Sequence, residues 1–377
     1  MTIGFRLLKT DRTTGARLGV LETPRGDVPT PVFMPVATQA TVKAMEPEGV
    51  AGSGARILLA NAYHLHLHPG EDLVAAHGGL HSFMNWPHPI ITDSGGYQVF
   101  SLPEREISEE GVRFRQQKNG EPFTLTPEGS MAIQEKLGAD IVMAFDECVP
   151  YPTPYPYAKE AMERTVRWAK RCLAAHGRED QAVFPIVQGS TYADLRRGCA
   201  EELAALDTPG IAIGGLSVGE GLEVMTEVLG HTLPHLPPEK PRYLMGVGLP
   251  EDILACVEAG VDMSDCVIPT KYARSGVFFT QVGRLRITRR NYRKDRFPPD
   301  TNCRCPTCAH YSRAYLHHLF QSGEILGQML ATTHNLHFYQ QLMADIRNAI
   351  QQDRFAAFKK DFLSAYFREE KKTGHVR

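Results

Sequence analysis

Short runs of apolar residues recur along the chain, and each is followed at once by a polar residue or a glycine. Such runs are typical of buried strands that are apolar on both faces, as in a parallel sheet covered by helices. Between several of them lie segments with helical spacing, such as residues 158–177, where Gly177 suits a helix stop, and residues 191–206. The predicted strands are ILLANAY (57–63), PIITD (89–93), DIVMAFD (140–146), AVFPIVQ (182–188), GIAIGG (210–215), RYLMGVG (242–248) and VDMSD (261–265).

The alternation of strands and helices predicts an α/β fold. Seven such runs favour a closed (β/α)8 TIM-type barrel over an open sheet, and no glycine-rich dinucleotide fingerprint follows the first strand. In a barrel of this kind, residues at the carboxyl ends of the strands line the active site. This rule nominates five candidate residues: Asp93, Asp146, Gln188, Gly215 and Asp265.

Two regions break the alternation. In YPTPYPY (151–157) the prolines fix the backbone and lack amide donors, which predicts a stiff loop over the barrel mouth that is neither helix nor inner strand. Residues 284–345 contain basic residues, a cysteine cluster and helical segments, and we interpret them as a metal-pinned appendage. We therefore expect a catalytic barrel at 1–283, a basic zinc-binding subdomain at 284–345, and a C-terminal helix with a tail at 346–377 that completes the barrel exterior.

Composition changes this picture little. The 377 residues are 42% hydrophobic and 22% charged, which is ordinary for a globular protein. No apolar run is long enough to cross a membrane, and the first fifteen residues lack the features of a signal peptide. We therefore expect a cytoplasmic protein whose cysteines are reduced.

The formal net charge of −2 neither indicates nor excludes a nucleic-acid partner, because phosphate binding needs only a local basic surface. Between Arg284 and Arg296 the chain holds one acid, Asp295, and an aromatic residue, Tyr292, among many cations. Any single cation is best interpreted as a solvated charge, whereas the whole cluster, beside a candidate metal site, favours RNA backbone. We name seven residues the basic stripe: Arg284, Arg286, Arg289, Arg290, Arg293, Lys294 and Arg296.

Three of the eight cysteines, Cys303, Cys305 and Cys308, lie within six positions of the chain. In a reducing compartment this spacing indicates a structural zinc site, because three thiolates and one imidazole close a tetrahedral shell and leave no place for water. The HLHLH run at 64–68 would put three imidazoles on one face of a strand, but no cysteine or carboxylate joins them, so we expect no metal there. The histidines near the cysteines that could supply the fourth ligand are His310, His317, His318, His334 and His337.

Asp93 and Asp265 each end a predicted strand. Asp93 precedes SGGY (94–97), in which paired glycines let backbone amides approach a ligand and the tyrosine offers a face for stacking. Asp265 precedes a proline turn and a basic loop. One such aspartate is more often a cap or an ion-pair partner than a catalyst. Two at one barrel mouth favour glycosidic-bond chemistry, in which one carboxylate attacks and another moves protons.

Segments spread over the whole chain match one family. The matching stretches are PVFMPVATQATVKAM (31–45), ANAYHL (60–65), TDSGGYQVFSL (92–102), AFDEC (144–148), IVQGS (186–190), AIGGLSVGE (212–220), YLMGVGLPEDI (243–253), SDCVIPT (264–270), the cysteine cluster and THNLHFY (333–339). The chain therefore resembles the bacterial tRNA-guanine transglycosylases, the queuine tRNA-ribosyltransferase family, over nearly its whole length. So many matches in order are far more specific than any single motif.

The resemblance implies a role for each matching residue. Asp265 stands where the family has the nucleophile that attacks the ribose anomeric carbon and expels guanine, and Asp93 stands where it has the general acid/base. His334 stands at the position of the fourth zinc ligand, so that the metal site is Cys303, Cys305, Cys308 and His334. The implied base pocket consists of Asp93, Ser94, Gly95, Gly96, Tyr97, Asp146, Gln188, Gly215 and Met245.

Within this pocket the resemblance also implies how a base is recognised. Asp146 matches the carboxylate that accepts two hydrogen bonds from the purine edge, and Gln188 and Gly215 match the groups that read its carbonyl oxygen. Tyr97 and Met245 match the pair that sandwiches the extruded base. The loops implied to hold the anticodon nucleotides contain Gly246, Val247, Gly248, Leu249, Pro250, Glu251, Asp252, Thr270, Lys271, Tyr272, Ala273 and Arg274.

The resemblance therefore implies an enzyme that exchanges guanine at the wobble position of tRNAs with GUN anticodons, those for aspartate, asparagine, histidine and tyrosine, in queuosine biosynthesis. Cys148 and Val218 match the bacterial members, which take the small base preQ1 rather than queuine. A homodimer is implied too, with one structural zinc per chain and the zinc-binding region near the dimer contact. Ser264, the Lys271-Tyr272 pair and ITRRN (287–291) depart from the family pattern and affect the expected anticodon-loop contacts, but not the chemistry.

Two other hypotheses remain open at this point. The first is a non-catalytic tRNA-binding subunit of such an enzyme, which would be expected to lack Asp93 or Asp265. The second is a small-molecule barrel enzyme with an incidental zinc clip, which would have no need of the basic stripe or of the guanine-reading residues.

Overall fold

A computed structural model describes residues 3–116 and 120–368 of the chain. Its centre is a ring of parallel strands: β4 (Val32–Pro35), β5 (Leu58–Ala60), β6 (Ile90–Thr92), β10 (Ile141–Met143), β11 (Ala182–Phe184) with β12 (Ile186–Val187), β13 (Ile211–Ile213), β14 (Arg242–Leu244) and β15 (Met263–Cys266). Each pairs with the next, β15 pairs with β4, and a bridge between Val36 and Leu59 joins β4 to β5. The ring is therefore closed, and the expected (β/α)8 barrel is confirmed.

All seven apolar runs contain barrel strands. Between β11 and β12 stands Pro185, which has no amide to donate and so interrupts one run. The first barrel strand, β4, was not among the predicted strands, although VFMPVA (32–37) is as apolar as the others. The barrel interior is filled by inward-facing side chains such as Met34, Met143 and Phe184, so it is a packed core rather than a pore.

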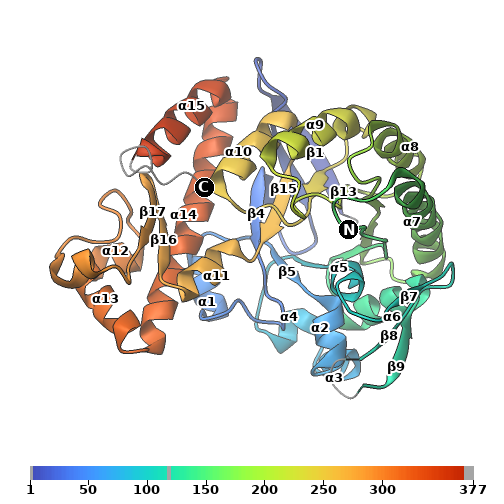
Figure 1. The fold of residues 1–377 in the computed structure, drawn as a ribbon, viewed down its shortest axis with the longest axis horizontal. Helices are drawn as coiled ribbons and strands as arrows, with labels where there is room; N and C mark the ends of the chain where they lie inside the picture. Colours follow the sequence, from blue (N-terminus) through green and yellow to red (C-terminus); the bar gives the residue numbers. More distant parts are fainter. Residues whose placement is uncertain (1–2, 117–119, 369–377) are drawn as a thin grey trace.

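Helices cover the outside of the barrel (Figure 1). They are α1 (Pro47–Gly52), α2 (Ala62–Leu67), α3 (Glu71–Ala76), α4 (Gly79–Phe83), α5 (Gly96–Phe100), α6 (Pro127–Leu137), α7 (Tyr155–Ala175), α8 (Ala193–Ala204), α9 (Leu222–Thr232) with the short η1 (Leu233–His235), α10 (Pro250–Ala259), α14 (Ile325–Gln351) and α15 (Phe355–Tyr366). No helix among the described residues has the length and apolar character needed to cross a bilayer.

Two local predictions were wrong. Helix α7 begins at Tyr155, inside the segment expected to be a non-helical loop. Pro154 is its N-cap and Pro156 lies in its first turn, where the missing amide would have no helical partner in any case. The HLHLH run lies in and just after α2, so its imidazoles do not share the face that strand alternation would give them.

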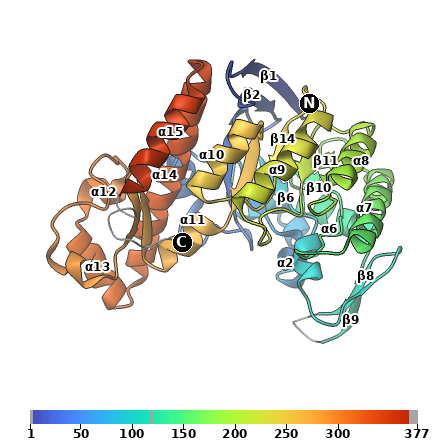
Figure 2. The ribbon, with the colours of Figure 1, turned by 45° about the horizontal axis from the view of Figure 1, so that its top comes forward.

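Two small antiparallel sheets flank the barrel. The first consists of β1 (Gly4–Thr10), β2 (Arg17–Glu22) and β3 (Val28–Thr30) and lies at one end of the barrel (Figure 2). It meets the amino ends of the barrel strands, where Nε of Arg17 is 3.2 Å from Oδ1 of Asp262. The second, β7 (Glu106–Ile107), β8 (Val112–Arg115) and β9 (Pro122–Leu125), projects between β6 and α6. We call the end of the barrel covered by the N-terminal sheet the floor, and the opposite end the mouth.

The zinc-binding region lies between the last barrel strand, β15, and the helix α14 that packs on β4. It consists of α11 (Ile268–Arg274), the hairpin β16 (Val277–Thr280) and β17 (Gly283–Arg286), η2 (Arg290–Lys294), α12 (Pro306–His310) and α13 (Arg313–Gln321). Phe278, Leu285, Leu316 and Ala331 form its apolar core. Helix α14 thus belongs to both parts of the molecule, and it runs through residues 345 and 346, where we expected a domain boundary.

Candidate active site and metal centre

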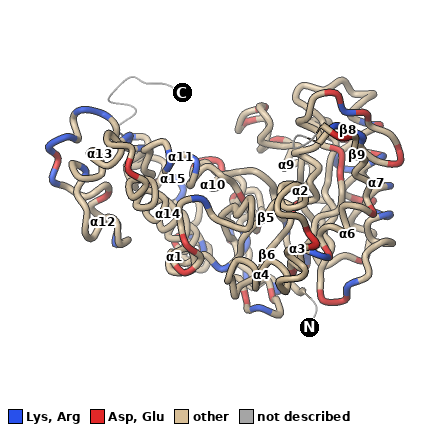
Figure 3. Tube along the Cα trace, turned by 90° about the horizontal axis from the view of Figure 1, so that it is seen from below, with Lys and Arg blue, Asp and Glu red and all other residues tan. Residues whose placement is uncertain are grey.

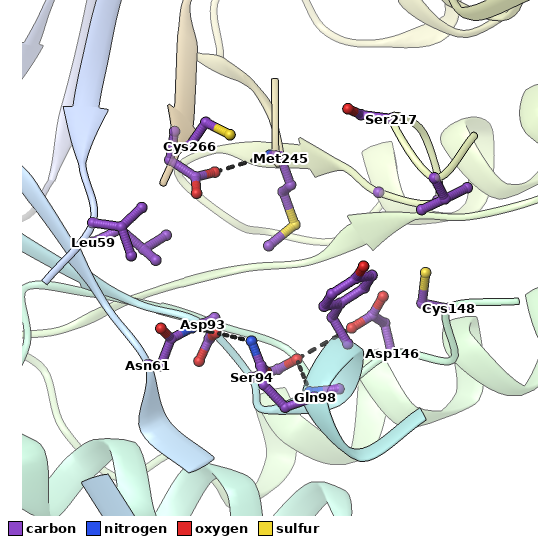
Figure 4. Close-up of a pocket in the computed structure, with 18 of the residues that line it drawn as sticks. Leu59, Asn61, Asp93, Ser94, Gln98, Asp146, Cys148, Ser217, Met245 and Cys266 are labelled. Carbon is purple, nitrogen blue, oxygen red and sulfur yellow. Dashed lines mark hydrogen bonds between the residues drawn. The ribbon is translucent and has the colours of Figure 1, made fainter. Parts of the chain in front are cut away.

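A cavity of about 460 Å³ opens at the carboxyl ends of the barrel strands (Figure 4). Its wall includes every residue nominated by the strand-end rule: Asp93, Asp146, Gln188, Gly215 and Asp265. Of the other pocket residues that the resemblance implied, Ser94, Gly96, Tyr97 and Met245 line the cavity, whereas Gly95 does not. Segments that are far apart in sequence therefore bring three aspartates to one cavity.

Asp93 follows β6 and is held by neutral donors. Its Oδ1 accepts a hydrogen bond from the backbone N–H of Ala62 at 2.8 Å, and its Oδ2 accepts bonds from the amides of Gln98, at 3.0 Å, and Asn61. Burial raises the pKa of Asp93 to about 6 despite these donors, and the nearby charge of Asp265 adds to the effect. A carboxyl group with this pKa can both give and take a proton near neutral pH.

Asp265 lies in β15, next to β14. Its Oδ1 accepts hydrogen bonds from the hydroxyl of Tyr243, at 2.6 Å, and from the backbone N–H of Gly246, at 3.1 Å. Burial raises the pKa of Asp265, and the same two bonds oppose that rise because they stabilise its charged form. The carboxylate is thus oriented by two fixed groups from the neighbouring strand end, as a nucleophile needs to be.

Asp146 follows β10 and faces Gln188, which follows β12. The Gln188 side-chain amide donates to Asp146 Oδ2 at 2.7 Å, and the Ser94 hydroxyl donates to Oδ1 at 3.1 Å. Burial raises the pKa of Asp146 to about 6. The other amide atom, Gln188 Oε1, is buried and has no partner among the described residues. The pair therefore keeps unused hydrogen-bonding capacity, as expected where a polar ligand completes the network.

Two consecutive glycines make room for Gln188. A Cβ on Gly214 would lie 2.7 Å from Gln188 Nε2, and a Cβ on Gly215 would lie 2.3 Å from Gln188 Oε1. Gly215 also has φ of +64°, a conformation that favours glycine. Any side chain at either position would displace the glutamine from Asp146.

Aromatic and sulfur side chains flank the cavity. Tyr97 in α5 is 62% exposed, whereas Met245, just after β14, is half-buried against the barrel core. Cys148 and Val218, both partly buried, also line the wall.

The segments implied to contact the anticodon differ in exposure. In residues 246–252, Gly246 is the exposed residue. Leu249 and Asp252 are half-buried, and the buried residues are Val247, Gly248, Pro250 and Glu251. Residues 270–274 form the end of helix α11 rather than a loop; Lys271 is exposed, Tyr272 and Arg274 are half-buried, and Thr270 and Ala273 are buried. Backbone and a few side chains therefore make up the accessible part of both segments.

The basic stripe is exposed at all seven positions. It runs from β17 through η2, which packs beside α13, and it forms a positive edge of the zinc-binding region (Figure 3).

The cysteine cluster and His334 come together beneath this edge. Cys303, Cys305, Cys308 and His334 offer ligand atoms that all lie within 4.8 Å of one another. Nδ1 of His334 is 3.2 Å from Sγ of Cys308 and 3.5 Å from Sγ of Cys305. Nε2 of His334 lies 2.6 Å from the carbonyl oxygen of Phe279, which only accepts, so Nε2 carries the proton and Nδ1 is left to bind a metal. A donor set of three thiolates and one imidazole fits one tetrahedral zinc ion.

Comparison with known proteins agrees with this geometry. A family model described as queuine tRNA-ribosyltransferase matches residues 11–368. The chain belongs to the queuine tRNA-ribosyltransferase family. Curated relatives with that name include a protein of Desulforamulus reducens, 54% identical over 367 residues that cover 97% of this chain and 99% of the relative. A protein of Caldanaerobacter subterraneus subsp. tengcongensis is 55% identical over 372 residues, 98% of this chain and 99% of the relative. A protein of Staphylococcus haemolyticus is 54% identical over 366 residues, 97% of each chain.

Family membership bears out three expectations from the sequence. The queuine tRNA-ribosyltransferases are tRNA-guanine transglycosylases, and hence pentosyltransferases, with a TIM barrel. The cluster of Cys303, Cys305, Cys308 and His334 is consistent with the structural zinc of this family. Of the histidines that the spacing left open, His317 instead lies 2.8 Å, through Nδ1, from the carbonyl oxygen of Ile287.

Sequence reasoning missed several residues of this queuine tRNA-ribosyltransferase site. Asn61 directly follows the apolar run ILLA, so the strand-end rule could have nominated it. Tyr243 and Gln98 carry no such signal, because a tyrosine inside a strand and a glutamine inside a helix are ordinary. Arg196 is another: it lies in the middle of α8, and its contact with the site depends on how that helix packs.

Proposed function

We propose that the protein exchanges guanine for preQ1 at the wobble position of tRNAs with GUN anticodons, through a covalent enzyme–RNA intermediate. The observation that carries the proposal is the pair of buried aspartates, Asp93 and Asp265, facing one cavity in a chain whose relatives are named queuine tRNA-ribosyltransferase. Two neighbouring carboxylates suit a glycosidic-bond exchange that passes through an ester to the enzyme.

The reaction has two balanced steps. A carboxylate oxygen of Asp265 bonds to C1′ of the ribose, the bond from C1′ to N9 of guanine breaks, and its electron pair leaves with the base. Asp93 gives its proton to that nitrogen. In the second step Asp93 takes the proton from N9 of the incoming base, the nitrogen bonds to C1′, and Asp265 leaves as the carboxylate. The raised pKa of Asp93, about 6, supports its use in both directions.

Base selection rests on Asp146, Gln188 and the N–H of Gly215. A carboxylate that faces N1–H and the 2-amino group of guanine satisfies two hydrogen bonds, whereas adenine would leave it unpaired in a buried site. The burial of Asp146 and the spare capacity of Gln188 support this assignment. Tyr97 and Met245 are proposed to hold the flipped base between them.

The choice of preQ1 over queuine rests on the wall beside Gly215. Cys148 and Val218 line the cavity, and both match the bacterial members, which take a purine with a small substituent. Exchange assays with preQ1, preQ0 and queuine test this choice. Incorporation of queuine at a rate similar to that of preQ1 would contradict it.

The tRNA is proposed to lie across the mouth and the positive edge, with residues 246–252 and 270–274 near the anticodon loop and the basic stripe on phosphates. The exposure of all seven stripe cations supports this placement. Removing Arg289, Arg290 or Arg293 singly should weaken tRNA binding only several-fold and lower the slope of log K against log salt by about 1. An unchanged salt slope would contradict phosphate contact.

A homodimer is proposed as the working form. Apolar residues lie exposed on the zinc-binding region, among them Tyr315, Leu326, Met329 and Ile325, which is 70% exposed. Exposed apolar side chains on two helices in contact, α13 and α14, support an interface there. Ile325→Glu should therefore shift the sedimentation of the protein from dimer to monomer.

The central test is displacement of labelled guanine from unmodified tRNA. The intact protein should release guanine when preQ1 is added, and denaturation during turnover should trap RNA on Asp265. Asp265→Asn should release none and trap none. If the intact protein released no guanine, the proposal would be contradicted, and a non-catalytic tRNA-binding subunit would be favoured instead.

A further inference from the structure

Arg196, in helix α8, is fully buried behind the base-reading wall of the cavity. Among the described residues, its guanidinium donates only to backbone carbonyl oxygens: Nε to Ser190 at 2.7 Å, Nη1 to Val187 at 3.1 Å and to Gly214 at 2.8 Å, and Nη2 to Gly215 at 3.3 Å. One side chain thus joins the ends of β12 and β13.

Within the described part of the chain, Arg196 has no carboxylate within 4.0 Å, so it takes part in no ion pair there. The other deeply buried arginines differ, since Arg17 pairs with Asp262 and Arg164 with Glu147. Burial lowers the pKa of Arg196 to about 10, which leaves it charged at neutral pH. Keeping an unpaired cation in a protein interior costs free energy, so a neutral residue would serve better if packing were its whole purpose.

The peptide bond between Gly214 and Gly215 links this cation to the cavity. Its carbonyl oxygen accepts the 2.8 Å bond from Arg196, and its N–H belongs to Gly215, which lines the cavity together with Cys148. A cation bound to the oxygen of a peptide withdraws electrons from its nitrogen and strengthens its N–H as a donor. The charge of Arg196 is therefore relayed to a backbone donor of a residue that lines the cavity.

We propose that Arg196 is a positioning residue of the exchange reaction, which acts through the Gly214–Gly215 peptide to stabilise negative charge on the 6-carbonyl oxygen of the purine. This inference rests on the proposed function. When the bond from C1′ to N9 breaks, its electron pair enters the purine ring, and part of the charge resides on that oxygen until Asp93 supplies the proton. A polarised N–H aimed at this oxygen acts as an oxyanion hole does.

The test compares guanine with 6-thioguanine, which keeps N1–H and the 2-amino group but replaces the oxygen by a weakly accepting sulfur. We expect Arg196→Met to lower the affinity for guanine about tenfold, less than the loss of about 10²–10³ that follows removal of a whole oxyanion donor, because the N–H remains. Calorimetric titration measures both affinities, and the affinity for 6-thioguanine should change less than about twofold. Equal losses for both bases, or no loss for guanine, would overturn the inference.

Two further arginine variants keep the test decisive if Arg196→Met fails to fold. Arg196→Gln is neutral but keeps an amide donor, so it should lose the preference for guanine. Arg196→Lys keeps the charge, so it should retain that preference. A preference lost in both or retained in both would overturn the role of charge.

Arg347→Met is the matched control, because Arg347 also donates to a backbone carbonyl, that of Pro31 at 2.8 Å, but at the floor of the barrel. It should leave both affinities unchanged. Single-turnover release of guanine from tRNA distinguishes failure of the proposed function from failure of the role of Arg196. If the wild-type protein releases no guanine, the proposed function fails; if it does and Arg196→Met releases it at the wild-type rate, this inference alone fails.

Discussion

Both ends of the barrel bury aspartates, but they surround them with different partners. At the floor, Asp140 lies 3.2 Å from Nε of Arg25 and 2.9 Å from Nε2 of His81, and Asp262 lies 3.2 Å from Nε of Arg17. At the mouth, the carboxylates accept hydrogen bonds from amides, hydroxyls and backbone N–H groups, and no cation pairs with them among the described residues. Burial and a place at a strand end are therefore common to both sets.

The partners of the buried carboxylates, rather than their pKa alone, distinguish the mouth of the barrel from its floor. Burial raises the pKa of Asp262 to about 6, as it does for Asp93 and Asp146. Asp262 is nevertheless paired with a fixed cation and accepts a hydrogen bond from the backbone N–H of Arg242, and it is not in the lining of the cavity at the mouth. Neutral donors hold the carboxylates at the mouth in place while leaving their protons and lone pairs available to a substrate.

The largest expected effect separates Asp265 from Asp262. Asp265→Asn should lower exchange by about 10⁴-fold or more, because an amide does not attack the sugar. Asp262→Asn should keep exchange near the wild-type rate but destabilise the fold by about 3 kcal/mol, because Arg17 is left unpaired. Single-turnover guanine release and urea unfolding measure the two effects. A folded Asp262→Asn protein without activity would contradict the distinction between the aspartates at the mouth and those at the floor.

Asp146→Asn should separate stability from function at one residue. Guanine binding should fall about 10²-fold, because the amide cannot accept both purine donors. Stability at pH 7 should rise by about 1–3 kcal/mol, because the cost of burying the charge is removed.

The sign of the pH dependence follows from the raised pKa of Asp146. Between its usual value and about 6 the folded state binds more protons than the unfolded state, so the wild type gains stability as pH falls through this window. The advantage of Asp146→Asn over the wild type should therefore shrink from pH 7 to pH 5. Asp140→Asn is the matched variant at the floor, and it should lose stability at pH 7. A stability loss in Asp146→Asn would contradict the account.

The first half-reaction should slow about tenfold per pH unit above the pKa of Asp93, near 6, because guanine departs with the proton of Asp93. On the acid side it should slow as Asp265 becomes protonated. Rapid-quench measurement of the trapped RNA intermediate between pH 4.5 and 8.5 gives both limbs. A rate that stays constant from pH 6 to 8.5 would exclude Asp93 as the acid.

The smallest expected effect comes from Tyr243→Phe, which removes the hydroxyl that donates to Asp265. Loss of this bond should raise the pKa of Asp265 further and move the acid limb of the same profile to higher pH. His81→Phe removes a contact of Asp140 at the floor and should leave the limb in place. An acid limb that does not move in Tyr243→Phe would show that Tyr243 merely packs.

Much of the architecture could be predicted from the apolar runs, because a strand buried on both faces has few alternatives. Strand β4 was not predicted because its apolar run lies among prolines. Helix α7 begins earlier than expected because proline is tolerated in the first turn of a helix. The strand-end rule nominated Asp93, Asp146, Gln188, Gly215 and Asp265, and all five line one cavity because the carboxyl ends of parallel strands converge. It could not find Arg196, whose role depends on the packing of α8.

The sequence by itself determined the barrel fold, the three cysteine ligands and membership of the family, because each follows from local patterns of polarity and spacing. Tertiary structure alone decided that Nδ1 of His334 faces the thiols and that Tyr243 supports Asp265. It also decided that, in the part of the chain that the structure describes, neutral donors hold the aspartates at the mouth whereas cations pair with those at the floor. The physical reason is that burial and partners, which determine the pKa and reactivity of a carboxylate, come from residues far apart in the chain.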